Sequence, residues 1–286
     1  MPKVISIINL KGGVGKTTLA VALGEFLSLL HGLKVLIIDT DPQTNATVAL
    51  MDEKEWKRRN VKGQTLLGIF KDVVDKYQVF SPAEAIVKGV SNIAGGIENL
   101  HLLPSSLDLI EFQEEFLYKA HNHEEIFKPS LLQERLQEVL PSYDIVLIDC
   151  PPDLGFITRN GLYMSDYYLI PVIPDILSTY GIPQIISRVE KLKKRTGTVI
   201  EPLGIVVSKF RVQSSVHKSQ LSLLRARARE VGYQRVFETV ISENNRSAAV
   251  MDFHHSFNRL EEKYGYPYQK PYAEYKSLAE EVLAYV

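Results

Sequence analysis

A glycine-rich loop near the start of the chain constrains its fold more than any other feature. The loop lies between the apolar run Val4–Ile8, which predicts a buried strand, and a helical pattern of apolar residues over Thr17–Leu30. It reads Lys11-Gly12-Gly13-Val14-Gly15-Lys16-Thr17-Thr18. In a strand–loop–helix unit of this kind, backbone N–H groups of the loop and the first turn of the helix converge on phosphate oxygens. The sequence therefore predicts a P-loop that holds the phosphates of a nucleotide.

The side chains of this loop have distinct expected roles. Lys16 should reach the β and γ phosphates, and the hydroxyl of Thr17 should coordinate Mg²⁺. ATP and Mg²⁺ are therefore the expected cofactors, with residues 11–18 surrounding the nucleotide. Lys11 is not needed to bind phosphate within one subunit, so the loop alone leaves open that this lysine is only a solvated charge.

Short apolar runs alternate with helical patterns along the rest of the chain. The further expected strands are Val35–Ile38, Leu100–Leu103, Ile145–Ile148, Tyr168–Ile173, Leu203–Val207 and Val236–Ile241. The further expected helices are Leu66–Lys76, Leu107–Lys119, Ser130–Leu140, Ile157–Met164, Ile182–Lys194, Ser214–Val231 and Tyr272–Tyr285. Such alternation predicts an α/β fold, with a mostly parallel twisted sheet flanked by helices in one domain over residues 1–286. Two segments that fit this pattern poorly, 51–64 and 257–271, are expected to be insertions.

Aspartates follow two of the expected strands. Asp39 and Asp41 come after Val35–Ile38, and Asp149 ends the run Ile145–Ile148. Carboxylates at the carboxyl ends of parallel strands lie beside the crevice in which α/β proteins bind ligands. We expect Asp149 to hold Mg²⁺ through water opposite Thr17 and Asp39 to support the same magnesium shell. A turn or capping role is the alternative for any single aspartate here.

These three motifs occur in the order found in the ParA/MinD superfamily. Residues 11–18, 39–47 and 144–152 resemble its deviant Walker A loop and its two acidic boxes, and the resemblance to the ParA partition ATPases covers Lys3 to about Gly181. It implies a homodimer that closes around ATP, with Lys11 reaching the nucleotide of the partner subunit. It also implies that Asp41 positions or activates the attacking water, so Lys11, Lys16 and Asp41 are the expected catalytic residues.

The resemblance also implies an activity cycle and a base-binding region. Hydrolysis of ATP would be slow and stimulated by a ParB-like adaptor protein. The adenine and ribose would lie against residues 208–210 and 242–246, but Ser242 and Glu243 depart from the Pro-Arg-Asn pattern of the family. Only Asn244 matches it, so Asn244 is the one base-binding residue that we carry over.

The final third of the chain is basic, although the formal net charge of the whole chain is only −1. Residues 186–246 carry 13 Lys or Arg against 5 Asp or Glu. The expected DNA-contacting residues are Lys209, Arg211, Lys218, Arg225, Arg229 and Arg246. A solvated helix face is the alternative, and the ParA resemblance favours DNA. Because we find no motif that reads bases, such binding would be independent of sequence.

Other classes of protein fit the sequence less well. The end of the chain carries three glutamates against the single Lys276 over residues 272–286, which is the wrong charge for a MinD-like membrane helix. Cys150 is the only cysteine, which excludes an internal disulfide, fits a reducing cytoplasm and argues against iron–sulfur relatives. We therefore expect a cytoplasmic, nucleoid-associated protein without a membrane partner. Its cargo would be a plasmid or chromosome, or alternatively a protein assembly such as a microcompartment or a chemotaxis cluster.

Overall fold

The fold is built on one eight-stranded sheet with the order β3-β4-β2-β5-β1-β6-β7-β8. The computed structural model describes residues 1–75, 80–120, 128–228, 233–244, 250–266 and 269–286. The strands are β1 (Lys3–Ile7), β2 (Val35–Asp39), β3 (Val87–Lys88), β4 (Leu100–Leu103), β5 (Ile145–Asp149), β6 (Tyr167–Val172), β7 (Glu201–Phe210) and β8 (Val236–Ser242). Neighbouring strands are parallel except β3 and β4, which are antiparallel. All seven expected strands are confirmed, and the two-residue strand β3 is too short for a sequence pattern to show.

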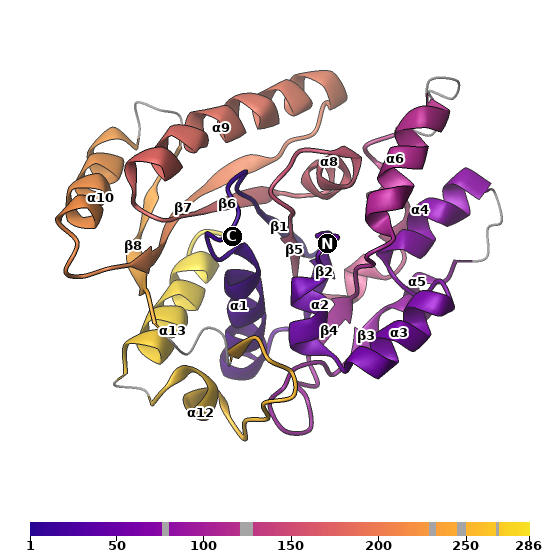
Figure 1. Ribbon diagram of the computed structural model, residues 1–286, viewed down its shortest axis with the longest axis horizontal. Helices are drawn as coiled ribbons and strands as arrows, with labels where there is room; N and C mark the ends of the chain where they lie inside the picture. The colour runs from indigo at the N-terminus through magenta and orange to yellow at the C-terminus, as the bar shows by residue number, and fades with distance from the viewer. Residues whose placement is uncertain (76–79, 121–127, 229–232, 245–249, 267–268) are drawn as a thin grey trace.

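Helices cover both faces of this sheet (Figure 1). Those described are α1 (Lys16–His31), α2 (Asn45–Leu50), α3 (Glu53–Val61), α4 (Leu66–Asp75), α5 (Pro82–Ala85), α6 (Leu109–Ala120), α7 (Leu131–Leu136), α8 (Phe156–Tyr163), α9 (Ile176–Thr196), α10 (Ser215–Arg227), α12 (Leu260–Tyr264) and α13 (Lys270–Leu283). A 3₁₀ turn spans Leu140–Ser142. Alternate residues of the central strand β5 enter two separate hydrophobic cores: Val146 and Ile148 pack toward α4 and α6–α9, and Ile145 and Leu147 toward α1 and α13. Because both faces are covered, every residue of β5 is buried, as in parallel sheets generally.

Two expected helix boundaries are wrong. Helix α9 begins at Ile176, six residues before the expected start at Ile182, and it contains Pro183 in its interior. Proline is favoured in the first turn of a helix, so Pro183 in the sequence is compatible with a start at Ile182 and does not indicate an interior position. Helix α7 ends at Leu136 instead of Leu140, and the chain continues into the 3₁₀ turn.

The segments 51–64 and 257–271 both contain helices that pack against the domain. In the first, α3 buries Trp56, whose indole N–H donates to the carbonyl oxygen of Ser105 over 2.9 Å. In the second, α12 carries Lys263, which is buried against α1. Both segments are therefore joined to the domain by buried contacts.

A buried polar cluster connects α12 to the middle of α1. The carboxylate of Glu25 accepts hydrogen bonds from Lys263 Nζ at 2.6 Å, Tyr264 Oη at 2.7 Å and Ser91 Oγ at 2.5 Å. The side chains of Glu25 and Lys263 are both 0% exposed. A buried carboxylate is tolerated only when it is paired and hydrogen-bonded, and here three donors from two distant segments surround it.

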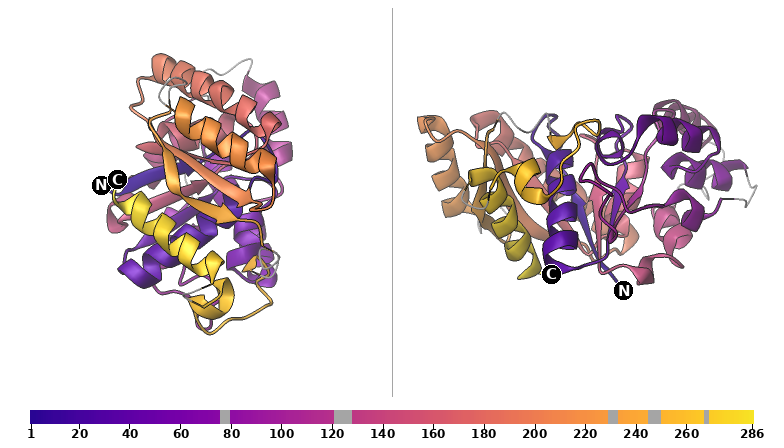
Figure 2. Two further views of the ribbon diagram at one scale, coloured as in Figure 1. Left: turned by 90° about the vertical axis from the view of Figure 1, so that its left-hand side faces the viewer. Right: turned by 90° about the horizontal axis from the view of Figure 1, so that it is seen from below.

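The carboxyl ends of the strands lie together at one end of the sheet, and both chain termini lie at the other end (Figure 2). The loops that follow β1, β2, β5, β6, β7 and β8 are therefore neighbours. Of the helices that the structure describes, none combines the length and the apolar character that crossing a membrane requires.

Candidate nucleotide-binding site

The loop between β1 and α1 has the backbone of a phosphate cradle. Gly13 and Gly15 have φ angles of 75° and 89°, a region that residues with a side chain rarely adopt. Gly12 is exposed, and a Cβ atom added to it would meet no other atom within 4 Å. The protein itself therefore does not explain why position 12 is glycine, because this residue is not crowded by protein atoms and does not have a positive φ angle. Open space above the loop suits a close approach by a phosphate group.

Two buried polar side chains hold this loop in place. Asn9 was not among the expected site residues, and Ser208 was expected only as part of the base-binding stretch 208–210. Asn9 donates from Nδ2 to the carbonyl oxygen of Pro171 over 2.8 Å, and its Oδ1 accepts from the N–H of Lys11 over 2.9 Å. Ser208 Oγ donates to the carbonyl oxygen of Val14 over 2.7 Å. The available signal was a polar residue at the end of an apolar run, two residues after β1 for Asn9 and within β7 for Ser208.

Lys16 is positioned by the first turn of α1 and is only 7% exposed. Its Nζ lies 3.4 Å from the carbonyl oxygen of Lys11. Burial lowers the pKa of this amine, while the nearby carboxylates of Asp149 and Asp41 raise it. The structure therefore brings the expected phosphate-binding lysine together with two of the three expected acidic residues.

Asp149 is the residue that best fits a bound cation. It is 0% exposed, and neither of its carboxylate oxygens has a hydrogen-bond partner within normal distance in the part of the chain that the structure describes. Burial, and then the adjacent Asp39, raise the pKa of Asp149 well above its usual value, and the hydroxyl of Thr17 lowers it. A buried carboxylate without donors is costly unless a positive charge approaches it. Thr17 and Asp149 together offer the hard oxygen ligands that Mg²⁺ prefers beside a phosphate.

Asp39 lies directly beside Asp149 in the register of β2 and β5, but its carboxylate is occupied by protein donors. Its Oδ1 accepts from the N–H of Asp41 at 3.1 Å, and its Oδ2 accepts from the N–H and the hydroxyl of Thr47 at 2.9 and 2.7 Å. The contacts of Asp39 therefore organise residues 41–47. Any effect of Asp39 on a metal ion would therefore be indirect, exerted through residues 41–47 or through Asp149.

Asp41 is held near the P-loop by the turn that follows β2. It is 6% exposed, and its Oδ1 accepts from the N–H of Gln43 over 2.9 Å. Burial raises the pKa of Asp41, as does Asp153, while Lys16 lowers it. Asp41 thus lies in the same electrostatic cluster as Lys16, and Asp153 is a member that the sequence pattern missed.

Lys11 differs from Lys16 in its surroundings. Its side chain is 41% exposed, and its Nζ lies 3.1 Å from Oδ2 of Asp175, just before α9. Within one chain, this ion pair connects the start of the loop to the residue just before α9. Asp175 follows a proline that comes after β6. In the sequence, this proline indicates that the strand has ended, but nothing indicates that Asp175 pairs with Lys11.

Those residues expected to bind DNA or the base that the structure describes lie at the β7–β8 edge of the sheet. Arg211 forms two hydrogen bonds with Glu243, and Arg225 pairs with Glu238 at 3.0 Å. Lys218 is exposed on α10, while Lys209 is partly exposed with a φ of 49°. Asn244 follows β8, with its Nδ2 3.5 Å from the carbonyl oxygen of Ser242. Arg229 and Arg246 lie outside the described residues.

The raised pKa of Asp39 predicts how stability depends on pH. Burial raises this pKa from 3.8 to about 7. Between those values the folded state binds more protons than the unfolded state, so stability falls as pH rises through this window and levels off above it. The slope is at most about 1.4 kcal/mol per pH unit for one group.

Guanidinium unfolding without nucleotide or metal, at pH 5 and pH 8, measures this effect. Wild type is expected to lose more stability than Asp39→Asn between the two pH values. An equal loss in both proteins would contradict a titrating Asp39.

The fold is shared with solved nucleotide-bound proteins. A plasmid partition protein from Borrelia burgdorferi B31 bound to AMPPNP superimposes with a TM-score of 0.75 at 23% identity, over 100% of both chains. Cobyrinic acid a,c-diamide synthase from Mycobacterium smegmatis, bound to ADP and magnesium, gives a TM-score of 0.71 at 22% identity, over 99% of this chain and 94% of the other. The expected P-loop NTPase fold is therefore confirmed.

Sequence comparison identifies the family. A family model described as an AAA domain matches residues 2–201. The chain is 31% identical over 246 residues to the sporulation initiation inhibitor protein Soj of Bacillus subtilis, covering 86% of each chain. It is 30% identical over 282 residues to the chromosome-partitioning ATPase Soj of Thermus thermophilus, covering 99% of this chain and 96% of that one. The P-loop, the two acidic strand ends and these relatives agree, and the chain belongs to the ParA family of partition ATPases.

Proposed function

We propose that this protein is a Mg²⁺-dependent ATPase that closes into a homodimer when ATP binds and hydrolyses ATP slowly until an adaptor stimulates it. The observation that carries the proposal is the buried carboxylate of Asp149, which lies beside Lys16 and the hydroxyl of Thr17 and has no hydrogen-bond partner at normal distance among the residues that the structure describes. Mg²⁺, bound by Thr17 and the phosphates, would supply the missing positive charge. Asp41 would orient the attacking water.

The position of Lys11 supports the proposed homodimer. This lysine is 41% exposed, and within its own chain its Nζ pairs with Asp175. A cation delivered across a dimer interface stabilises the charge on the transferred phosphoryl group, as an arginine finger does. Closure and hydrolysis would then form a switch between a monomer and a dimer.

We further propose that the closed dimer binds DNA without sequence preference and partitions a plasmid or chromosome, in the cytoplasm and on the nucleoid. The basic residues of β7 and α10 lie on one edge of the sheet, and pairing two subunits would join two such edges. A ParB-like adaptor would stimulate hydrolysis and release the dimer. The relative from Thermus thermophilus is named as a chromosome-partitioning ATPase, which supports this cargo.

Positioning of a protein assembly remains the second candidate. The ion pairs of Arg211 with Glu243 and of Arg225 with Glu238 neutralise part of the basic edge, and this observation favours a weaker role for DNA. The two candidates differ in which protein accelerates hydrolysis.

Light scattering after size-exclusion chromatography tests the switch. Wild type and Asp41→Ala are compared with ADP and with ATP, each with Mg²⁺. Asp41→Ala with ATP is expected to form a stable dimer, because it retains binding but lacks the residue that orients water. A mass that never depends on the nucleotide would contradict the proposal.

The salt dependence of binding to random-sequence DNA tests the basic edge. The slope of log K against log salt is expected to be near −0.9 for each neutralised phosphate. Lys218→Ala should reduce its magnitude by about one per subunit, because Lys218 is exposed. Arg225→Ala is the matched control and should change the slope less, since Glu238 already neutralises Arg225. Equal slopes in all three proteins would remove Lys218 from the DNA surface.

A further inference from the structure

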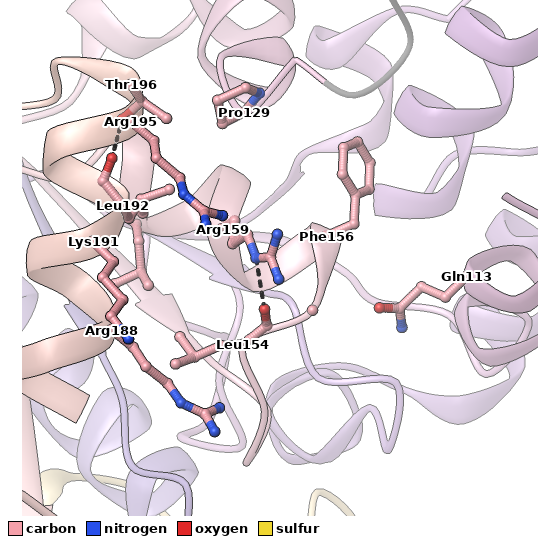
Figure 3. Close-up of a pocket in the computed structure, with 12 residues that line it drawn as sticks. Gln113, Pro129, Leu154, Phe156, Arg159, Arg188, Lys191, Leu192, Arg195 and Thr196 are labelled. Atoms are coloured by element: carbon pink, nitrogen blue, oxygen red, sulfur yellow. Dashed lines mark hydrogen bonds between the residues drawn. The ribbon is translucent and has the colours of Figure 1, made fainter. Parts of the chain in front are cut away.

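A cavity lies away from the P-loop, between α8 and α9 and beside the segment that precedes α8. Its volume is about 570 Å³, within the range of ligand pockets. Figure 3 shows that side chains from both helices surround it. Apolar side chains line much of it, among them Leu154, Phe156, Leu162 and Leu192. Such a surface favours a partner that brings an apolar group.

Four cationic side chains surround the same cavity. Arg188, Lys191 and Arg195 extend from α9, and Arg159 extends from α8 (Figure 3). The three from α9 are spaced by three and four residues, so they share one face of that helix. All four are exposed. Arg159 Nε donates to the carbonyl oxygen of Leu154 over 2.9 Å, which fixes one side of the opening.

None of these four cations forms an ion pair with a carboxylate of the residues that the structure describes. Lys193, on the same helix but outside the cavity, pairs with Glu201 at 2.7 Å and Glu190 at 3.3 Å. On another surface of the chain, Arg211 pairs with Glu243 and Arg225 pairs with Glu238. The cavity therefore concentrates uncompensated positive charge around apolar walls, which attracts a negatively charged partner.

The arrangement distinguishes between kinds of anion. Residues 188 to 195 span about 10 Å along α9 at 1.5 Å per residue, so the charges form a row instead of converging on one point. A row fits a linear partner. DNA presents phosphates on its outer surface and would leave the apolar walls unused, whereas a peptide can place carboxylates on the cations and an apolar side chain in the cavity.

We propose that this cavity is a docking site for an acidic, amphipathic protein segment. The segment would insert one apolar side chain between Leu154 and Leu192 and align its carboxylates with the three cations of α9. The site is distinct from the nucleotide loop, but one of its lining residues, Leu154, lies only five residues after Asp149. Binding here therefore contacts the chain segment that leads out of the candidate magnesium site.

Fluorescence anisotropy with a defined peptide tests the proposal. The probe is a labelled 12-residue peptide with a central leucine and three glutamates, each one helical turn from the next, and the control peptide carries glutamine in place of each glutamate. Wild type is expected to bind the acidic peptide at least about tenfold more tightly, with an affinity that falls as salt rises. The double variant Arg188→Glu, Arg195→Glu should lose at least about tenfold in affinity for the acidic peptide.

Lys194→Glu is the matched control, because Lys194 is an exposed cation of α9 outside the cavity. It should keep nearly the affinity of wild type. Circular dichroism confirms that each variant is folded. Leu154→Ser should lower the affinity for the acidic peptide but leave the salt dependence of binding unchanged, because this substitution alters only the apolar wall.

Three results would overturn the proposal. The first is that wild type binds the two peptides equally or not at all. The second is that Lys194→Glu weakens binding as much as the double variant, which would show only general attraction. The third is that random-sequence DNA displaces the peptide and the double variant loses DNA binding equally, which would assign this face to nucleic acid. None of these measurements needs ATP or a dimer, so failure here is distinct from failure of the proposed function.

Discussion

Neither Lys11→Ala nor Asp41→Ala is expected to hydrolyse ATP alone, but an equimolar mixture of the two is expected to recover part of the wild-type rate. If Lys11 acts across the dimer, the mixed dimer contains one complete site, in which the Lys11→Ala subunit supplies Asp41 and its partner supplies Lys11. Random pairing makes half of the dimers mixed, so about a quarter of all sites are active. Each variant alone should lose about 100-fold or more, as when a group that stabilises the transition state is removed.

Phosphate release from ATP, measured as a function of the mixing ratio, tests this expectation. The rate should pass through a maximum near equal amounts of the two variants. A mixture of Lys16→Ala with Asp41→Ala is the control and should stay inactive if Lys16 serves its own subunit, because no site then contains both groups. If Lys11 acted within its own subunit, no mixture with Asp41→Ala would regain activity.

Replacing Lys263 with alanine is expected to destabilise the fold by about 3–5 kcal/mol, the range for breaking one side of a buried ion pair. The variant would leave the carboxylate of Glu25, which is fully buried, without its charged partner. Guanidinium unfolding of the nucleotide-free protein measures the change. Lys276→Ala is the matched control, because Lys276 pairs with Glu280 at 3.8 Å on the exposed side of α13 and should be nearly neutral.

A second pair of variants separates the lost ion pair from lost packing. Lys263→Met with Glu25→Leu removes both charges at similar volume and should recover much of the stability, since apolar replacement of a whole buried pair is often neutral. Lys263→Met alone should be nearly as destabilised as Lys263→Ala. If Lys263→Met were as stable as wild type, the ion pair would contribute nothing to holding α12 on α1.

The sequence predicted the sheet and the phosphate loop because each depends on local patterns. An apolar run ending in an acid placed Asp149 correctly at the end of β5, and the loop motif placed Lys16 beside it. Parallel strands bring their carboxyl ends together, so motifs far apart along the chain meet without further information.

Contacts between distant segments could not be predicted in this way. Glu25 and Lys263 are separated by 238 positions, and each alone is an ordinary charged residue in a helical pattern. Trp56 looked like part of an insertion because the residues around it are charged, yet it is buried with its indole N–H on Ser105. Pro183 did not indicate its interior position in α9, since a proline inside a helix looks like one at its beginning. Such outcomes depend on tertiary packing that one sequence does not reveal.

The ion pair between Lys11 and Asp175 makes dimer formation less favourable if Lys11 must leave Asp175 to reach the partner subunit. A partly exposed pair of this kind is worth about 0.2–1 kcal/mol. Forming one homodimer breaks two such ion pairs, one in each subunit. The free-energy cost of association is therefore twice that of one pair, which weakens the dimer by about 2- to 30-fold. In each free subunit, Lys11 is thus paired with Asp175 of its own chain instead of reaching the partner's nucleotide. Dimers therefore form at a higher protein concentration than the interface alone would require.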